Sequence, residues 1–372
     1  MRTRRTLFIL LVVFCPSTES AEGRQLTPEL KQFEDEQAVR DLRQYHAWLA
    51  AYRNGDPEAI AWLLALDRKR VARVVSRATG AQDPFRPWER ERFEAAALLH
   101  TDAARQLLEL DDGEGAFFHL DMGSRILAKA AADMRDFASR WYFTVSRYLR
   151  ELDELSIADK LLQLGRRRLP ENALLLYESG TLEEISATLF SEGHGVSENV
   201  RRRRGDLNNA ASWFREALTQ SERLAGPRIQ SDGNADFALV AGLHFGRVQT
   251  LRGEDRDALE HLGKVLGSTS DAATAYLAAL FTGAAHERRG RLDAAADAYR
   301  QAISRFAAGY AAPMALSAVL QRLGHGDRSR EVLLEVVSEA AGPVREPWWW
   351  YLFEPPGVAY ERLTKLRSEV VR

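Results

Sequence analysis

The sequence is short of the groups that carry covalent and metal chemistry. It contains one cysteine, Cys15, which lies in an N-terminal apolar run that we expect to be removed from the mature chain. The mature protein would then have no disulfide bond, no thiolate nucleophile and no cysteine-ligated metal. Beyond that run no segment reaches about 18 uninterrupted apolar residues, so the sequence predicts no transmembrane helix.

Charge of one sign is also lacking. Lysine and arginine together number 51 and aspartate and glutamate 53, for a formal net charge of −2. Nucleic-acid-binding proteins usually carry a clear basic excess, so no nucleic-acid partner is expected. Hydrophobic residues make up 45% of the chain and charged residues 28%, which indicates a folded protein. Its 372 residues exceed one ordinary core and predict several cores or an extended array.

Catalytic motifs are absent from the sequence. None of the eight histidines belongs to a His-Glu-x-x-His pattern, and there is no phosphate-binding glycine loop or Gly-x-Ser-x-Gly elbow. The adjacent Glu183 and Glu184 would diverge on a helix, unlike a catalytic carboxylate pair. The sequence therefore predicts no enzyme, no cofactor and no metal. The alternative is an enzyme whose site lies beside an inserted loop that contains His194.

The N-terminus has the order of a secretory signal peptide. Three arginines among the first five residues precede the apolar run TLFILLVVFC and the small, polar stretch PSTESA. We therefore predict a signal peptide over residues 1–21 and a periplasmic or secreted bacterial protein. A lipid anchor at Cys15 is the alternative, although Phe14 stands where a small residue is expected. A cytoplasmic regulator is the further alternative if this signal is misread.

Helix signals follow one another along the rest of the chain. Thr27-Pro28 begins an amphipathic segment that ends near residue 54, and further segments with helical spacing cover residues 56–80 and 88–110. No stretch alternates apolar and polar residues long enough for a strand. The sequence predicts an all-α protein with an irregular helical N-terminal region over residues 27–136.

A repeated helix pair is the central pattern. Gly283, Gly290, Ala295, Tyr299 and Ala302 place a small residue in one helix, a glycine at a turn, and small, aromatic and small residues in the next helix. Two helices pack closely only where small residues allow approach and a large residue fills the space beside them. The same spacing recurs in copies marked by Gly246, Gly253, Ala258 and Leu262; by Gly324, Leu320, Ser329 and Leu333; by Ala158, Leu162, Gly165 and Pro170; and by Gly180, Gly205, Ala210 and Phe214.

This pattern resembles the tetratricopeptide repeat family, whose period is about 34 residues. Gly324 follows Gly290 at that interval. The resemblance implies a right-handed α-solenoid of antiparallel helix pairs over residues 137–338. Residues 104–123 resemble a degenerate further copy, and the copy around Ala158 has Ser146 and Asp153 in place of glycines. An irregular helical bundle is the alternative fold.

Two insertions and an aromatic stretch interrupt or end the repeats. Residues 188–205, with arginines at 201–204, and residues 225–236 have the composition of loops. The arginines could bind a carboxylate-rich or phosphate-bearing partner, or form a solvated face or the first turn of the next helix. Residues 339–372 contain the run PWWWYLFEPP. We predict that its rings cover the last repeat and that a capping helix over 358–371 closes the array. The alternative is an exposed aromatic patch that binds a partner or a sugar.

The resemblance also implies a binding surface. Tetratricopeptide arrays commonly bind extended peptides in a concave groove formed by the first helix of each pair. Arginine forks suit carboxylates, so the arginines among these helices favour an acidic segment or a free C-terminus of a peptide or protein partner. Arg140, Arg147 and Arg247 form the hypothesised basic groove. The function expected is a non-enzymatic protein-interaction scaffold of the bacterial envelope. The partner-binding candidates are Arg140, Phe143, Arg147, Arg150, Tyr177, Arg247, Leu280 and Glu287.

Overall fold

A computed structural model describes residues 89–128, 134–189, 196–223, 237–339, 346–352 and 357–370, together with Pro28, Gln32, Glu36, Arg40 and Ala47. The described residues from 89 onward belong to one of the chain's two units, which spans residues 86–372 together with 48–66. The predicted signal peptide and the helix predicted over 56–80 lie outside the described residues.

Every regular element in the described ranges is helical, which confirms the all-α prediction. The N-terminal half of this unit contains α4 (Glu89–Leu108), α5 (Gly113–Ala128), α6 (Arg135–Glu151), α7 (Leu155–Arg168), α8 (Ala173–Leu189) and α9 (Val196–Arg223). It continues with α10 (Phe237–Arg252), α11 (Asp255–Ser268), α12 (Ala272–Arg288), α13 (Leu292–Arg305), α14 (Ala311–Arg322) and α15 (Gly326–Glu339). It ends with α16 (Trp349–Leu352) and α17 (Val358–Val370). None of the described helices is both long and apolar enough to cross a membrane.

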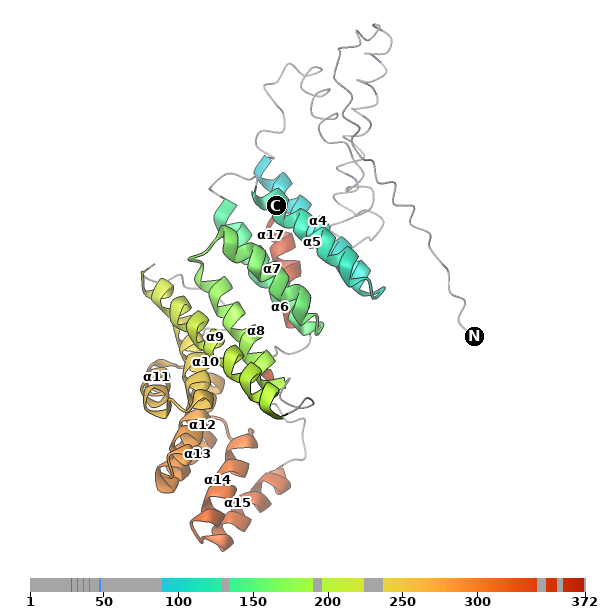
Figure 1. Cartoon of the computed structure of the whole chain (residues 1–372). Helices are drawn as coiled ribbons and strands as arrows, with labels where there is room; N and C mark the ends of the chain where they lie inside the picture. The colour runs from blue at the N-terminus through green and yellow to red at the C-terminus, as the bar shows by residue number, and fades with distance from the viewer. Residues whose placement is uncertain are drawn as a thin grey trace. The chain divides into compact units, whose positions relative to one another are not determined.

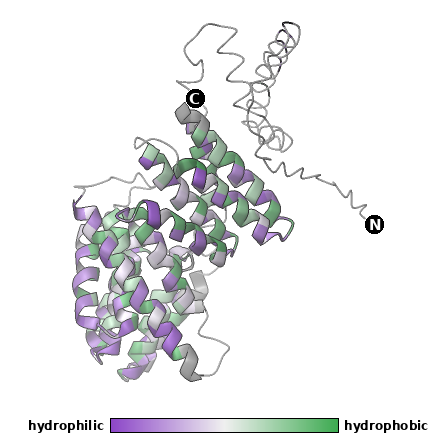
Figure 2. Cartoon of the chain, turned by 45° about the horizontal axis from the view of Figure 1, so that its top comes forward, coloured by the Kyte–Doolittle hydropathy of each residue, from purple (hydrophilic) through white to green (hydrophobic). Residues whose placement is uncertain are grey.

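The helices pack in consecutive pairs. Helix α4 packs against α5, α6 against α7, α8 against α9, α10 against α11, α12 against α13, and α14 against α15. From α7 onward the second helix of each pair also packs against the first helix of the next (Figure 1). Most helices carry hydrophobic and hydrophilic residues on different sides (Figure 2). The predicted solenoid of helix pairs is confirmed, and α4 with α5 forms the pair expected around residues 104–123.

Glycines on the first helices admit large side chains from the second helices. A Cβ atom added at Gly283 would lie 2.3 Å from a ring carbon of Tyr299, and one at Gly180 would lie 2.7 Å from the ring of Phe214. Both rings are fully or almost fully buried. The small–aromatic pattern of the sequence is therefore a real packing contact, because any side chain at these glycines would overlap the ring.

The turns within pairs use left-handed backbone. Gly253, Gly290 and Gly324 have φ angles of +83°, +70° and +82°. In the α6–α7 pair the same place is taken by Asp153, with φ of 64°. Aspartate tolerates this conformation better than most residues, so the turn forms without a glycine.

The first predicted insertion is largely helical. Helix α9 begins at Val196, so the arginines at 201–204 lie within it and are exposed, and the prediction of a loop there is wrong. Arginine, glutamate and leucine are good helix formers, and they extend α9 towards its N-terminus. The second predicted insertion, at 225–236, lies outside the described residues.

The C-terminal helix forms as predicted but packs elsewhere. Its partners are α6 and α4, beside which it lies in Figure 1, and not the last pair. Ala359, Leu363 and Leu366 are buried in the same cluster as Trp141. The apolar stripe of α17 finds an apolar surface here, whereas Leu334 on α15 remains 60% exposed. The prediction that this helix closes the last repeat is therefore wrong.

Candidate functional site

Residues 346–352, which we call the return segment, lie along the first helices of the pairs. At one end Glu346 accepts hydrogen bonds from the backbone N–H groups of Tyr310 (2.6 Å) and Ala311 (3.0 Å) at the start of α14. Its carboxylate therefore caps that helix. At the other end the backbone carbonyl of Leu352 accepts a hydrogen bond from Arg150 on α6. The segment thus reaches back from the last pair to the first helix of a pair near the start of the array.

Two rings of the return segment stack around one arginine. Trp348 and Tyr351 are one helical turn apart and nearly parallel, with ring centroids 5.7 Å apart. The guanidinium carbon of Arg247, on α10, lies 4.3 Å from the Trp348 centroid and 4.8 Å from that of Tyr351. Phe281 of α12 meets both rings edge-on. Cation–π attraction and ring packing hold this part of the segment.

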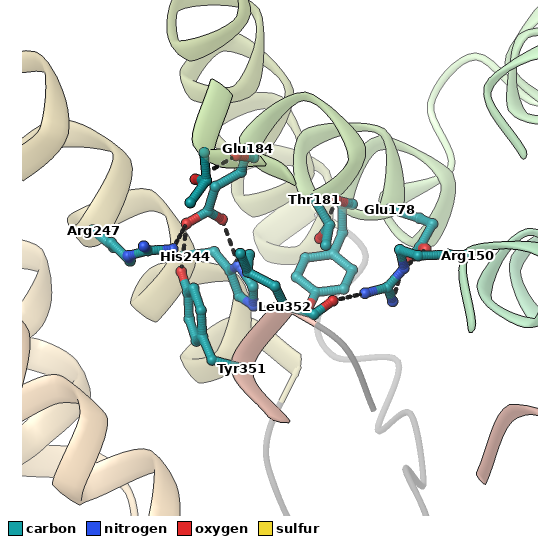
Figure 3. A network of polar contacts seen from close by, with 10 residues as sticks. Arg150, Glu178, Thr181, Glu184, His244, Arg247, Tyr351 and Leu352 are labelled. Atoms are coloured by element: carbon teal, nitrogen blue, oxygen red, sulfur yellow. Dashed lines mark hydrogen bonds and ion pairs between the residues drawn. The ribbon is translucent and has the colours of Figure 1, made fainter. Parts of the chain in front are cut away.

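Glu184 on α8 is the centre of the polar contacts (Figure 3). One of its carboxylate oxygens accepts hydrogen bonds from Arg247 (2.7 Å) and from the Tyr351 hydroxyl (2.9 Å). The other oxygen lies 2.8 Å from Nδ1 of His244, whose ring stacks on Tyr351 at 4.3 Å. The Glu184 side chain is fully buried. Its charge is therefore balanced by groups from α10 and hydrogen-bonded by the return segment.

The surroundings decide the protonation of these groups. Burial alone would raise the pKa of Glu184, but His244 and Arg247, with hydrogen bonds from His244 and Tyr351, hold it below the usual range. Burial and the Glu184 carboxylate raise the pKa of the Tyr351 phenol well above its ordinary value. Burial raises the pKa of Tyr177, whose hydroxyl lies 3.1 Å from His244 Nε2, to about 12. At neutral pH the network holds one carboxylate and two intact phenols.

A second ion pair lies under the end of the segment. Arg150 donates from Nε to one carboxylate oxygen of Glu178 at 2.8 Å and from Nη2 to the other at 3.3 Å. Both side chains are almost completely buried. The remaining nitrogen, Nη1, donates to the Leu352 carbonyl. One arginine therefore joins α6, α8 and the return segment through a two-point pair.

The structure brings two of the predicted binding residues to the return segment and places a third in the same hydrophobic cluster. Arg150 and Arg247 contact it directly, and Leu280 is buried in the same cluster as Tyr351 and Leu352. Tyr177 instead lies in the core between α8, α9 and α10, against Phe214 and Phe237.

The other predicted residues contact other parts of the chain. Arg140 is exposed and pairs with Asp136 and with Glu369 of α17. Arg147 packs over the ring of Phe143 with its guanidinium carbon 5.0 Å from the centroid. Glu287 accepts from Tyr299 and pairs with Arg322. Arg140 and Arg247 both pair with carboxylates of this chain, so their charges in the hypothesised basic groove are neutralised.

The sequence reasoning gave no role to Glu178, His244, Trp348 and Tyr351 at this surface. Arg150 pairs with Glu178 and Arg247 with Glu184, each pair joining two neighbouring first helices. The paired residues do not occupy corresponding repeat positions, so the repeat spacing gave no signal for them. Within the described part of the chain no three histidine, cysteine, aspartate or glutamate residues gather as a metal site. His194 lies outside the described residues.

The comparisons with known proteins found similar solved structures only. No family model and no curated protein matches the sequence. A solved structure of MamA from Desulfovibrio magneticus is similar to 55% of this chain over 98% of its own length, with 17% identity and a TM-score of 0.40. A human IFIT1 dimer with m7Gppp-AAAA is similar to 84% of this chain over 72% of its length, with 16% identity and a TM-score of 0.37.

A yeast Sti1 TPR2AB domain in a complex is similar to 75% of this chain over 99% of its length, at 11% identity and a TM-score of 0.27. Such identities and scores carry no argument about function. The fold itself is indicated by three features together: the helix pairs, the small–aromatic contacts and the left-handed turns. By these features the described part of the chain is a tetratricopeptide-like α-solenoid whose first helices hold its own return segment.

Proposed function

We propose that the protein is a non-enzymatic protein-interaction scaffold of the bacterial envelope that binds a partner polypeptide along the first helices of its repeats. The observation that supports this is the return segment itself. The first helices already hold a short length of polypeptide by its rings, a hydroxyl and a backbone carbonyl. These are the groups through which any peptide can be recognised.

Further residues of α6 are candidates for contact with the partner. Arg147 and Phe143 lie on α6, the helix that also carries Arg150. An arginine over an aromatic ring presents both a charge and a flat apolar surface. An acidic partner segment fits this combination. Export is proposed from the N-terminal sequence alone.

The partner site is tested by capture and reconstitution. The mature chain isolated from its own cells is used to capture proteins of the envelope fraction, and the most abundant stoichiometric partner is purified. Its Kd is then measured for wild type, for Arg147→Glu and for Arg300→Glu, a matched control on α13. We expect Arg147→Glu to weaken binding at least tenfold and the control to leave it unchanged. Equal binding by both variants would place the partner elsewhere.

Export has its own test. Cell fractionation followed by mass measurement of the intact protein should find a chain that lacks about the first 21 residues in the envelope or outside the cell. A full-length chain in the cytoplasm would contradict the proposal. Turnover of a substrate by the purified protein would favour the enzyme alternative.

A further inference from the structure

We infer that the return segment is an internal ligand, and that a partner binds by displacing it with a peptide of the same chemistry. That peptide carries a carboxylate, then tryptophan, two further residues and tyrosine. The inference rests on the proposed function and specifies its ligand. It is carried by the contacts that each residue of the segment makes.

The contacts read as a recognition pattern. Glu346 caps α14, Trp348 packs on Arg247 and Phe281, and Tyr351 donates to Glu184. Trp350, between these rings, is 40% exposed. The first helices therefore contact the first, third and sixth residues of the segment, and leave the Trp350 side chain partly exposed.

The lining of this surface suits repeated exposure to water. Beneath the segment lie the pairs Arg150–Glu178 and Arg247–Glu184, with His244 beside the second. Permanently buried ion pairs are costly, and apolar residues usually cover a lasting contact better. Both pairs consist of first-helix residues only. When the segment leaves, each charge keeps its partner and gains water.

The segment also has an anchor of its own. Helix α17 remains attached to α6 and α4 through Ala359, Leu363 and Leu366. Glu151 of α6 accepts from the backbone N–H groups of Gly357 (2.5 Å) and Ala359 (3.1 Å) at its start. The return segment can therefore leave without undocking α17. Tethering gives it a local concentration on the order of millimolar, which an external peptide must overcome.

The first test uses a labelled peptide with the sequence of residues 345–353, Arg-Glu-Pro-Trp-Trp-Trp-Tyr-Leu-Phe. Fluorescence anisotropy measures its binding to the full chain. We expect Trp348→Ala/Tyr351→Ala, which weakens the internal ligand, to bind it at least tenfold more tightly than wild type. Trp350→Ala, the matched control on the exposed side, should bind as wild type does. An opened variant that binds no more tightly overturns the inference.

The second test needs no substitution. Hydrogen exchange of the wild-type chain should show the amides of Trp348, Trp350 and Tyr351 exchanging by a local opening, at least tenfold faster than buried amides of α8, α10 and α17. Excess peptide should speed their exchange further. Exchange of the segment only together with those helices would make it a permanent part of the core and would overturn the inference.

A second copy of the chain is the competing occupant. Light scattering after size exclusion distinguishes it, because exchange of segments between copies would give a dimer that dissociates on dilution. Such a dimer, abolished by the peptide, would overturn the assignment to a partner protein. If the peptide tests fail, the inference about the internal ligand is wrong, but the capture experiment with Arg147→Glu still tests the proposed function. If capture fails, the proposed function is contradicted, but the measured peptide affinities still stand.

Discussion

The two sides of the first helices follow different rules. Towards the second helices, glycines at 180 and 283 meet buried aromatic rings, and the contact depends on shape alone. Towards the return segment, arginines, glutamates and a histidine form a buried polar network. On the side facing the second helices, each glycine leaves room for one particular ring. On the side facing the return segment, the ion pairs remain whether or not a peptide covers them. A stable array and a replaceable ligand can therefore use the same helices.

The largest effect should come from the shape-dependent side. Phe214 is fully buried, and Gly180 opposite it has no side chain that could fill a cavity. We expect Phe214→Ala to lower the free energy of unfolding by about 3–5 kcal/mol. Urea denaturation followed by circular dichroism measures the loss. Leu334→Ala, exposed on α15, is the control and should change it by less than about 0.5 kcal/mol. Similar losses of stability for Phe214→Ala and Leu334→Ala would contradict the tight packing of Phe214 against Gly180.

Removal of a charge from the polar side should cost less. Arg247→Met leaves the Glu184 carboxylate with its bonds from His244 and Tyr351 only. We expect a loss of about 1.5–3 kcal/mol in the same denaturation experiment, the range for hydrogen bonds to charged groups. Adding Glu184→Gln to Arg247→Met should restore part of the lost free energy of unfolding, because it removes the uncompensated negative charge. No recovery in the double variant would show that Arg247 acts through packing instead.

Acid should loosen the polar side before the shape-dependent side. The pKa of Glu184 is lower in the folded chain than its usual value near 4.5. Its contribution to stability is therefore complete above about pH 4.5 and is lost as the pH falls through the lower, folded value. Tryptophan fluorescence between pH 7 and pH 3 should report the change at Trp348. Glu184→Gln should remove this transition. An unchanged fluorescence curve in that variant would show that the transition does not depend on Glu184.

The smallest effect is expected at an exposed ion pair. Arg140, Asp136 and Glu369 are all solvent-exposed, unlike Arg150 and Glu178. Arg140→Ala should therefore lower the free energy of unfolding by only about 0–1 kcal/mol in urea denaturation. Arg150→Met, at the buried pair, should cost more. A larger loss for Arg140→Ala would mean that α17 depends on this pair.

The shape-dependent side was predictable from the sequence. Gly283 and Tyr299 were paired from spacing alone, because helix geometry determines which residues of neighbouring helices meet. The turn glycines followed from the need for positive φ, and Asp153 takes that conformation where the glycine is missing. The helices around α6 to α15 could be placed for the same reason. All these contacts join elements that are close in the sequence.

The return segment was not predictable in this way. Tyr351 meets Glu184 across 167 positions of sequence, and no repeat spacing encodes that contact. A tryptophan-rich run suits a covered end and a peptide-like ligand equally well, because both bury rings. Arg150 and Arg247 were expected to be exposed to a partner, but their acidic neighbours on α8 pair with them. Long-range pairing of this kind depends on three-dimensional distance alone.

The path of the C-terminus has a consequence for how the array unfolds. In an open solenoid each repeat touches only its neighbours, so the ends can fray independently. Here Glu346 holds α14, Leu352 holds α6, and α17 holds α4, so the late and early repeats are tied together. Residues 346–352 and α17 therefore link the late repeats to the early ones. Cutting the chain after residue 345 should turn one cooperative transition into several.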